Sequence, residues 1–118
     1  MSGSTPRIPR REMPVPGAAL SLIAVAFSEL RRDVSLLLES AWAEPVRRRA
    51  EELAATLADA CDRQGLADAC LAARSLANLA RLRADQVRPI QAALSRKLDE
   101  LLRSAQRHLD LATKRRLG

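Results

Sequence analysis

Apolar residues recur every three or four positions through four separate segments of this chain. In the first segment the residues that follow this spacing are Leu20, Ile23, Phe27, Leu30, Val34, Leu37 and Ala41. Such a period puts them on one face of an α-helix, because the α-helix turns once every 3.6 residues. The pattern predicts a helix that begins at Gly17 or Ala18 and ends near Trp42.

The three later segments are separated by residues that begin or end helices. Pro45 suits the first turn of a second helix, which we predict to run to about Gln64 because Gly65 can close it in the left-handed conformation. A third helix is predicted over 66–81, and a fourth begins between Asp85, a possible cap, and Pro89. The residues predicted to face inward are Val46, Ala50, Leu53, Leu57, Ala60, Leu66, Ala69, Cys70, Ala73, Leu76, Ala80, Ile90, Leu94, Leu98, Leu101, Ala105 and Leu109.

The amino-acid composition favours an all-α protein with a single domain. Among the 118 residues there are one Phe, one Trp and no Tyr, so the aromatic residues typical of strands are scarce. Four amphipathic helices with short connections predict an antiparallel four-helix bundle over residues 17–113. Residues 1–16 contain four prolines and three arginines and are expected to form a disordered arm, and residues 114–118 form a basic tail.

Most of the net charge of +6 belongs to the two ends of the chain. The arm and the tail are basic, whereas residues 17–113 are nearly neutral. A protein whose folded surface binds nucleic acid would be expected to carry a basic face. We therefore do not expect the bundle to bind nucleic acid, and weak association through the basic ends remains an alternative function.

Few residues of this chain can carry out chemistry. The two cysteines, Cys61 and Cys70, lie nine residues apart without a nearby histidine, so no metal site is expected, and no cofactor is expected either. The only histidine, His108, is interpreted as a half-exposed residue at the rim of the last helix. We predict a protein that is not an enzyme and is cytoplasmic, since no secretory signal is visible and the apolar run over 18–27 is too short to span a membrane.

The stretch "LADACDRQGLADACLAARSLANLA", residues 57–80, resembles the local pattern of histidine phosphotransfer (HPt) domains. These are four-helix bundles that relay phosphoryl groups between histidine kinases and receiver aspartates. Their pattern is a helix, a glycine turn, and a second helix reading roughly A-A-H-S-L-K-G-x-A. In this chain Arg74 stands in place of the histidine, and Ala77 and Asn78 replace the Lys-Gly pair. The resemblance, which spans about residues 37–105, implies a pseudo-phosphotransfer domain that keeps the fold without the phosphoacceptor.

The resemblance implies a protein partner, either a receiver domain or a histidine kinase. The predicted partner-binding residues are Arg74, Asn78, Arg81, Arg83 and Arg88. The alternative is a helical assembly protein that forms a homodimer through its first helix. That alternative depends on Leu22, Val25, Leu36 and Leu38, which widen the apolar surface of this helix beyond one face.

A second basic run, "PVRRRAEE" at residues 45–52, lies near the start of the second predicted helix. It is interpreted as a solvated face with ion pairs between Arg47 and Glu51 and between Arg48 and Glu52, each four residues apart. A patch for an acidic partner is the functional alternative.

Overall fold

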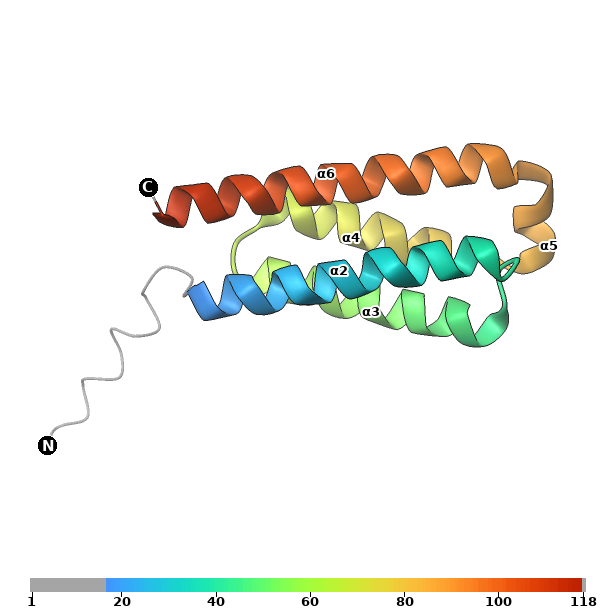
Figure 1. The fold of residues 1–118 in the computed structure, drawn as a ribbon, viewed down its shortest axis with the longest axis horizontal. Helices are drawn as coiled ribbons and strands as arrows, with labels where there is room; N and C mark the ends of the chain where they lie inside the picture. Colours follow the sequence, from blue (N-terminus) through green and yellow to red (C-terminus); the bar gives the residue numbers. More distant parts are fainter. Residues whose placement is uncertain (1–16, 118) are drawn as a thin grey trace, which may run out of the picture.

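The computed structural model describes residues 17–117, and within this range it contains helices and no strand (Figure 1). The predicted all-α class is therefore confirmed. The arm predicted over residues 1–16 lies outside the described residues, as does Gly118.

Four long helices make up most of the described chain, namely α2 (Gly17–Glu39), α3 (Glu44–Arg63), α4 (Ala67–Ala80) and α6 (Gln91–Leu117). A short helix α5 (Ala84–Val87) and a 3₁₀ turn η2 (Arg88–Ile90) connect α4 to α6. Each long helix contacts two others, since α2 and α4 both pack against α3 and α6. Successive long helices run in opposite directions along the molecule, as Figure 1 shows.

Helix α2 ends at Glu39, three residues before the predicted end at Trp42. Ala41 and Trp42 have φ values of 55° and 68°, in the left-handed region that residues with a side chain rarely occupy. The Trp42 backbone N–H donates to the Leu37 carbonyl oxygen at 2.8 Å, which closes the helix. The left-handed turn lets the Trp42 indole enter the core, where it is 3 % exposed.

The connection between α3 and α4 agrees closely with the sequence prediction. Pro45 occupies the first turn of α3, where its missing N–H breaks no helical hydrogen bond. Gly65 follows the helix with a φ of 75°, and the Leu66 N–H donates to the Cys61 carbonyl oxygen at 2.8 Å. Gly65 therefore reverses the chain between two helices that pack against each other.

The start of the last helix differs from the prediction in two ways. Asp85 is not the cap, because Arg83 occupies the cap position of α5 and its backbone N–H donates to the Gln86 Oε1 at 2.9 Å. Pro89 lies in η2, so the continuous helix α6 begins only at Gln91. At its other end α6 continues to Leu117, and residues 114–117, assigned to the basic tail, extend this helix.

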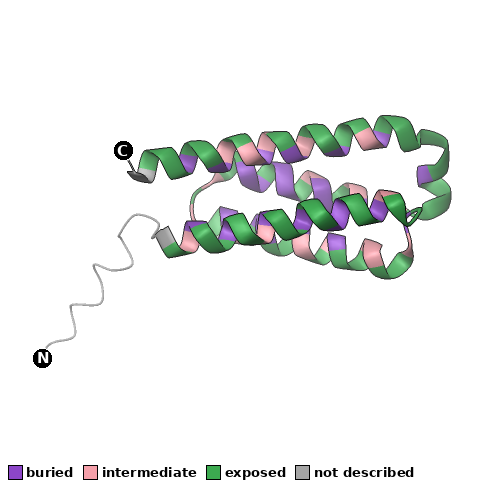
Figure 2. Cartoon of the chain, in the orientation of Figure 1, coloured by how far each residue is buried: buried purple, intermediate pink, exposed green. Residues whose placement is uncertain are grey.

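The core lies between the four long helices, and Figure 2 shows buried residues on their inward sides. Most of the predicted inward positions are buried, including Phe27, Leu30 and Leu76. Ala41 and Ile90 are exposed, because they lie in the turn after α2 and in η2 rather than inside a long helix. The inward face of α3 is also rotated from the predicted one, since its buried residues are Ala50, Ala54, Leu57, Ala58 and Cys61.

Candidate functional site

Three of the five predicted partner-binding residues line one shallow groove between α3 and α4. Arg74, Asn78 and Arg81 lie on one side of this groove, whose volume is about 310 Å³. Arg74 and Asn78 lie four residues apart on α4, and Arg81 follows three residues later as the residue that caps the helix, so this spacing puts all three on the same side. The other lining residues are Ala55, Ala58, Asp59 and Ala77. We call this surface the α3–α4 groove; its small alanine side chains leave room between the two helices.

Arg74 is the exposed cation near the middle of α4. Its Nε donates to the Cys70 Sγ at 3.3 Å, one turn earlier on the same helix. The contact with Cys70, together with the carboxylates of Asp62 and Asp59, raises the pKa of Arg74 above its already high usual value. The guanidinium therefore stays charged throughout the biological pH range and cannot act as a nucleophile.

Arg81, at the other end of the groove, is held by an ion pair. Its Nε lies 2.6 Å from the Glu51 Oε2 of α3. The hydrogen bond from Arg81, and secondly the one from Arg47, lowers the pKa of the Glu51 carboxyl below its usual value. A partner that recruits Arg81 would have to compete with Glu51, so Arg74 and Asn78 are the groove residues more available to a ligand.

Arg47 forms the centre of a network that joins the start of α3 to the end of α4. Its guanidinium contacts Glu44 at 2.9 Å, Glu51 at 3.0 Å and the Ala80 carbonyl oxygen at 3.2 Å. The predicted Arg47–Glu51 pair is therefore confirmed. The predicted partner of Arg48 is wrong, since Arg48 pairs with Glu44 at 3.1 Å, one turn earlier on α3. Glu44 thus accepts bonds from both arginines.

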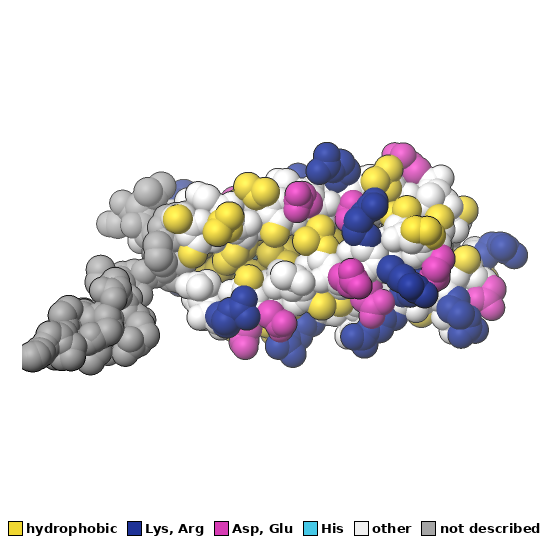
Figure 3. Space-filling model, turned by 90° about the horizontal axis from the view of Figure 1, so that it is seen from below, with side chains coloured by type: hydrophobic (Ala, Val, Ile, Leu, Met, Phe, Trp, Pro, Cys, Tyr) yellow, Lys and Arg dark blue, Asp and Glu magenta, His cyan; other side chains and the backbone are white. Residues whose placement is uncertain are grey.

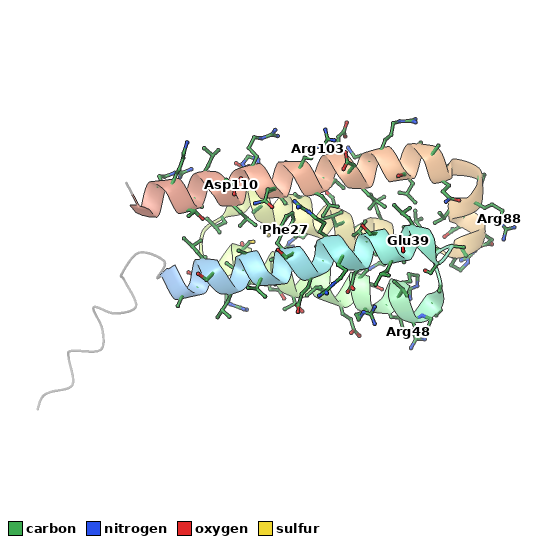
Figure 4. All side chains as sticks on the ribbon, in the orientation of Figure 1. Phe27, Glu39, Arg48, Arg88, Arg103 and Asp110 are labelled. Atoms are coloured by element: carbon green, nitrogen blue, oxygen red, sulfur yellow. The ribbon has the colours of Figure 1, made fainter. Side chains whose placement is uncertain are left out.

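The other two predicted residues, Arg83 and Arg88, do not line the α3–α4 groove. Arg83 precedes α5 and pairs with Asp85 at 3.3 Å. Arg88 lies in η2 beside a small pocket of about 60 Å³ that Trp42 also lines, and Figure 4 shows it at the end of the molecule near α5. The basic residues that are clustered in the sequence between 74 and 88 are thus divided between a helix face and one end of the fold.

Asp59 is a groove residue that the sequence analysis did not single out. The signal for it was present in the hairpin of α3 and α4, which reverses at Gly65. Two antiparallel helices bring together residues at similar distances from their turn, so a position before Gly65 can be matched with one after it. Asp59 lies six residues before Gly65 and Arg74 lies nine residues after it, and both line the groove.

The side chains best suited to nucleophilic or acid–base chemistry do not lie together at one site. Cys61 and Cys70 are buried as free thiols, and burial raises the pKa of Cys61 to about 11. His108 is 30 % exposed, as expected for a rim residue, and its Nδ1 lies 3.7 Å from the Asp68 Oδ2 of α4. Along residues 17–117, no group of three or more His, Cys, Asp or Glu side chains is arranged to hold a metal ion.

Several large apolar side chains lie on the outside of the fold. On α2, Leu22 is 71 % exposed, Val25 is 58 % exposed and Leu36 is 37 % exposed, whereas Leu38 is packed against the core. Figure 3 views the molecule from the side of α2 and α3, and hydrophobic side chains gather there in the part nearest the grey segment. Basic and acidic side chains lie next to one another over the remainder of that face.

Comparison with models of protein families, with curated proteins and with solved structures finds no match to this chain. Every helix in the described range is too short or too polar to cross a membrane.

Proposed function

We propose that this chain is a non-catalytic protein-interaction module. In this proposal it forms an antiparallel four-helix bundle similar to an HPt domain, and it binds a receiver domain or a histidine kinase without transferring a phosphoryl group. The observation that carries the proposal is the exposure of Arg74 on α4, beside a groove lined partly by alanines. The resemblance assigns this position to the acceptor histidine.

The path of the chain supports the bundle part of the proposal. The four long helices form a closed ring of contacts, and successive helices reverse direction (Figure 1). The glycine turn at Gly65 comes directly before the helix that carries Arg74. This order of helix, glycine turn and helix with an exposed central residue is the order expected from the resemblance.

The chemistry of the groove supports binding in preference to phosphotransfer. An arginine side chain is permanently cationic and offers five N–H donors in a planar fork that matches a carboxylate. Asn78, also exposed, lies one turn further along α4 and adds an amide that can donate or accept hydrogen bonds. Receiver domains carry a pocket of clustered aspartates, and such a pocket would be complementary to Arg74.

The experiment that tests this function is an affinity capture from a lysate of the source organism, analysed by mass spectrometry. The full chain and its Arg74→Glu variant serve as baits. Arg96→Glu serves as the matched control, since Arg96 is an exposed arginine on α6, outside the α3–α4 groove. Circular dichroism of all three proteins checks that their helix content is equal.

We expect the wild type and Arg96→Glu to capture a receiver or kinase protein that Arg74→Glu does not capture. The reason is that reversing the charge of Arg74 places a carboxylate against the partner's carboxylates. Capture of the same proteins by all three baits, or the absence of receiver and kinase proteins from the wild-type sample, would refute the proposal.

A further inference from the structure

Helix α2 carries a second stripe of evenly spaced residues on the side that faces away from the core. Its members are Ala18, Leu22, Val25, Glu29, Arg32 and Leu36, and they step by four and three residues alternately. We call this surface the outer α2 stripe. All six are exposed, whereas Leu20, Ile23, Phe27, Leu30 and Leu37 form the buried side of the same helix.

The spacing of the outer α2 stripe is that of a helix that packs against another helix. Residues that alternate between steps of three and four form the contact seam of a two-helix coiled coil. The described helices do not cover this seam, because Leu22 and Val25 are more than half exposed. The outer α2 stripe is therefore available for packing against a helix from outside the described chain.

Two successive residues of the stripe have opposite charges. Glu29 and Arg32 are both exposed and line an open groove beside α3. No ion pair among the described side chains, those of residues 18–115, uses either of them. Apolar residues flank this pair, with Val25 on one side and Leu36 on the other.

We propose that the outer α2 stripe binds the same stripe of a second copy of this chain, with the two α2 helices antiparallel. A two-fold axis between Glu29 and Arg32 sets the register of the two helices. In this register Glu29 of each copy lies opposite Arg32 of the other copy. Val25 of each copy then lies opposite Leu36 of the other, so that two ion pairs are enclosed by two apolar layers.

The charges favour a second copy in the antiparallel arrangement over a parallel one. A two-fold symmetric interface brings each surface against itself, so the stripe must be complementary to its own rotated image. Antiparallel pairing meets this condition at the two charged positions and at the two neighbouring apolar positions. A parallel pair in register would instead place Glu29 against Glu29 and Arg32 against Arg32, which is repulsive.

This dimer is separate from the proposed binding surface of Arg74. The outer α2 stripe lies on α2, whereas Arg74 lies in the groove between α3 and α4. Each copy of the dimer would keep its own α3–α4 groove. Arg74→Glu is therefore a control that should leave dimer formation unchanged, and the two proposals can fail independently.

The test is sedimentation velocity of the full chain over about 5 to 500 µM, a range suited to a dimer of micromolar affinity. The variants are Glu29→Arg, Arg32→Glu and the double exchange Glu29→Arg/Arg32→Glu, with Arg74→Glu as the control. Both charged residues are exposed, so circular dichroism should show unchanged helix content in every variant.

We expect the wild type and Arg74→Glu to dimerise, and each single charge reversal to weaken the dimer at least about tenfold through like-charge repulsion. The double exchange should restore the dimer, because each new arginine then faces a new glutamate. An equimolar mixture of the two single variants should also form a dimer, since one copy carries two arginines and the other two glutamates. A wild type that stays monomeric over the whole range, or a double exchange that dimerises no better than the single variants, would overturn the proposal.

Discussion

The indole Nε1 of Trp42 donates a hydrogen bond to the backbone carbonyl oxygen of Leu82 at a distance of 2.7 Å. This bond joins the turn after α2 to the turn after α4, two segments that are 40 residues apart in the sequence. Trp42 is almost completely buried, so both its ring and its N–H are removed from water. The contact fixes the end of the fold at which α5 and η2 lead the chain into α6.

Replacing Trp42 by phenylalanine should lower the free energy of unfolding by about 1–3 kcal/mol. The substitution keeps an aromatic ring but leaves the Leu82 carbonyl oxygen without its donor. Trp42→Ala should cost more, about 3–5 kcal/mol, because it also leaves a cavity. Urea unfolding monitored by circular dichroism measures both changes, and equal stability of Trp42→Phe and wild type would contradict the assigned role of the hydrogen bond.

Substitution of Gly65 by alanine should lower the stability by about 1 kcal/mol, through strain in the backbone alone. Gly65 has a φ of 75°, and a Cβ added there would meet no atom within 4 Å. Gly65→Asn is the matched control, because asparagine tolerates the left-handed conformation better than alanine and should lose less. Thermal unfolding of the three proteins would contradict this account if the asparagine variant were the less stable of the two.

Replacing Ala41 by glycine should stabilise the protein by roughly 0.5 kcal/mol. Ala41 has a φ of 55°, so its Cβ is strained where a glycine would not be. The gain is smaller than the strain itself, because glycine also increases the entropy of the unfolded chain. A rise in the thermal midpoint of Ala41→Gly checks this prediction, and a fall would mean that the left-handed turn is not strained.

The sequence predicted the long helices well because the spacing of apolar residues reports the helix face directly. Phe27, Leu30 and Leu76 are buried as that spacing requires. The end of α2 was predicted too late, because no glycine marks it and the left-handed turn is made by Ala41 and Trp42. The turn is favoured by the bond from the Trp42 N–H to the Leu37 carbonyl oxygen and by burial of the Trp42 ring, and this burial is a tertiary effect that the local sequence does not signal.

Only the part of the candidate site that lies on a single helix could be predicted from the sequence. Arg74, Asn78 and Arg81 line one groove, and their spacing of four and three residues accounts for this. The partner of Arg48 could not be chosen from the sequence, since an acidic residue lies four positions before it and another four positions after it. The separation of Arg88 from the groove depends on the geometry of α5 and η2, which no helix period describes.

Acid should destabilise the protein partly through Glu44. Hydrogen bonds from Arg47, and secondly from Arg48, lower the pKa of the Glu44 carboxyl from 4.5 to about 2. The stabilisation is therefore complete above about pH 4.5 and is lost as the pH falls toward 2, because protonation removes the charge that the arginines bind. Glu44 is exposed, so salt should reduce this effect.

The prediction for Glu44 is checked by measuring the urea midpoint between about pH 2 and pH 6, at low and at high salt. This range includes both the usual pKa of the Glu44 carboxyl and its lowered pKa in the folded protein. Glu44→Gln should show a smaller loss of stability across this range than the wild type. Glu39→Gln is the matched control, since Glu39 is an exposed glutamate at the end of α2 that forms no ion pair with the arginines of α3. Identical pH profiles for the wild type and Glu44→Gln would contradict the prediction.

The two cysteines should be inert in the folded protein and reactive once it unfolds. Both side chains are buried as free thiols, and burial raises the pKa of Cys61 to about 11. Because the thiolate is the reactive form, a thiol with this pKa is ionised to about one part in a thousand at a pH near 8. Labelling by iodoacetamide should therefore be slow in buffer and rapid in concentrated urea.

A cysteine introduced at an exposed position serves as the control. It tests whether slow labelling is caused by burial of the thiol or affects every thiol in this protein. Ser35→Cys places a thiol on the exposed side of α2, and it should react at the rate of a free thiol without urea. Mass spectrometry of the labelled peptides assigns the reaction to each position. Because labelling of Cys61 requires both solvent access and ionisation, its rate in intermediate urea should follow the unfolded fraction measured by circular dichroism. Labelling of Cys61 in the native protein as fast as at position 35 would show that the helices α3 and α4 open without global unfolding.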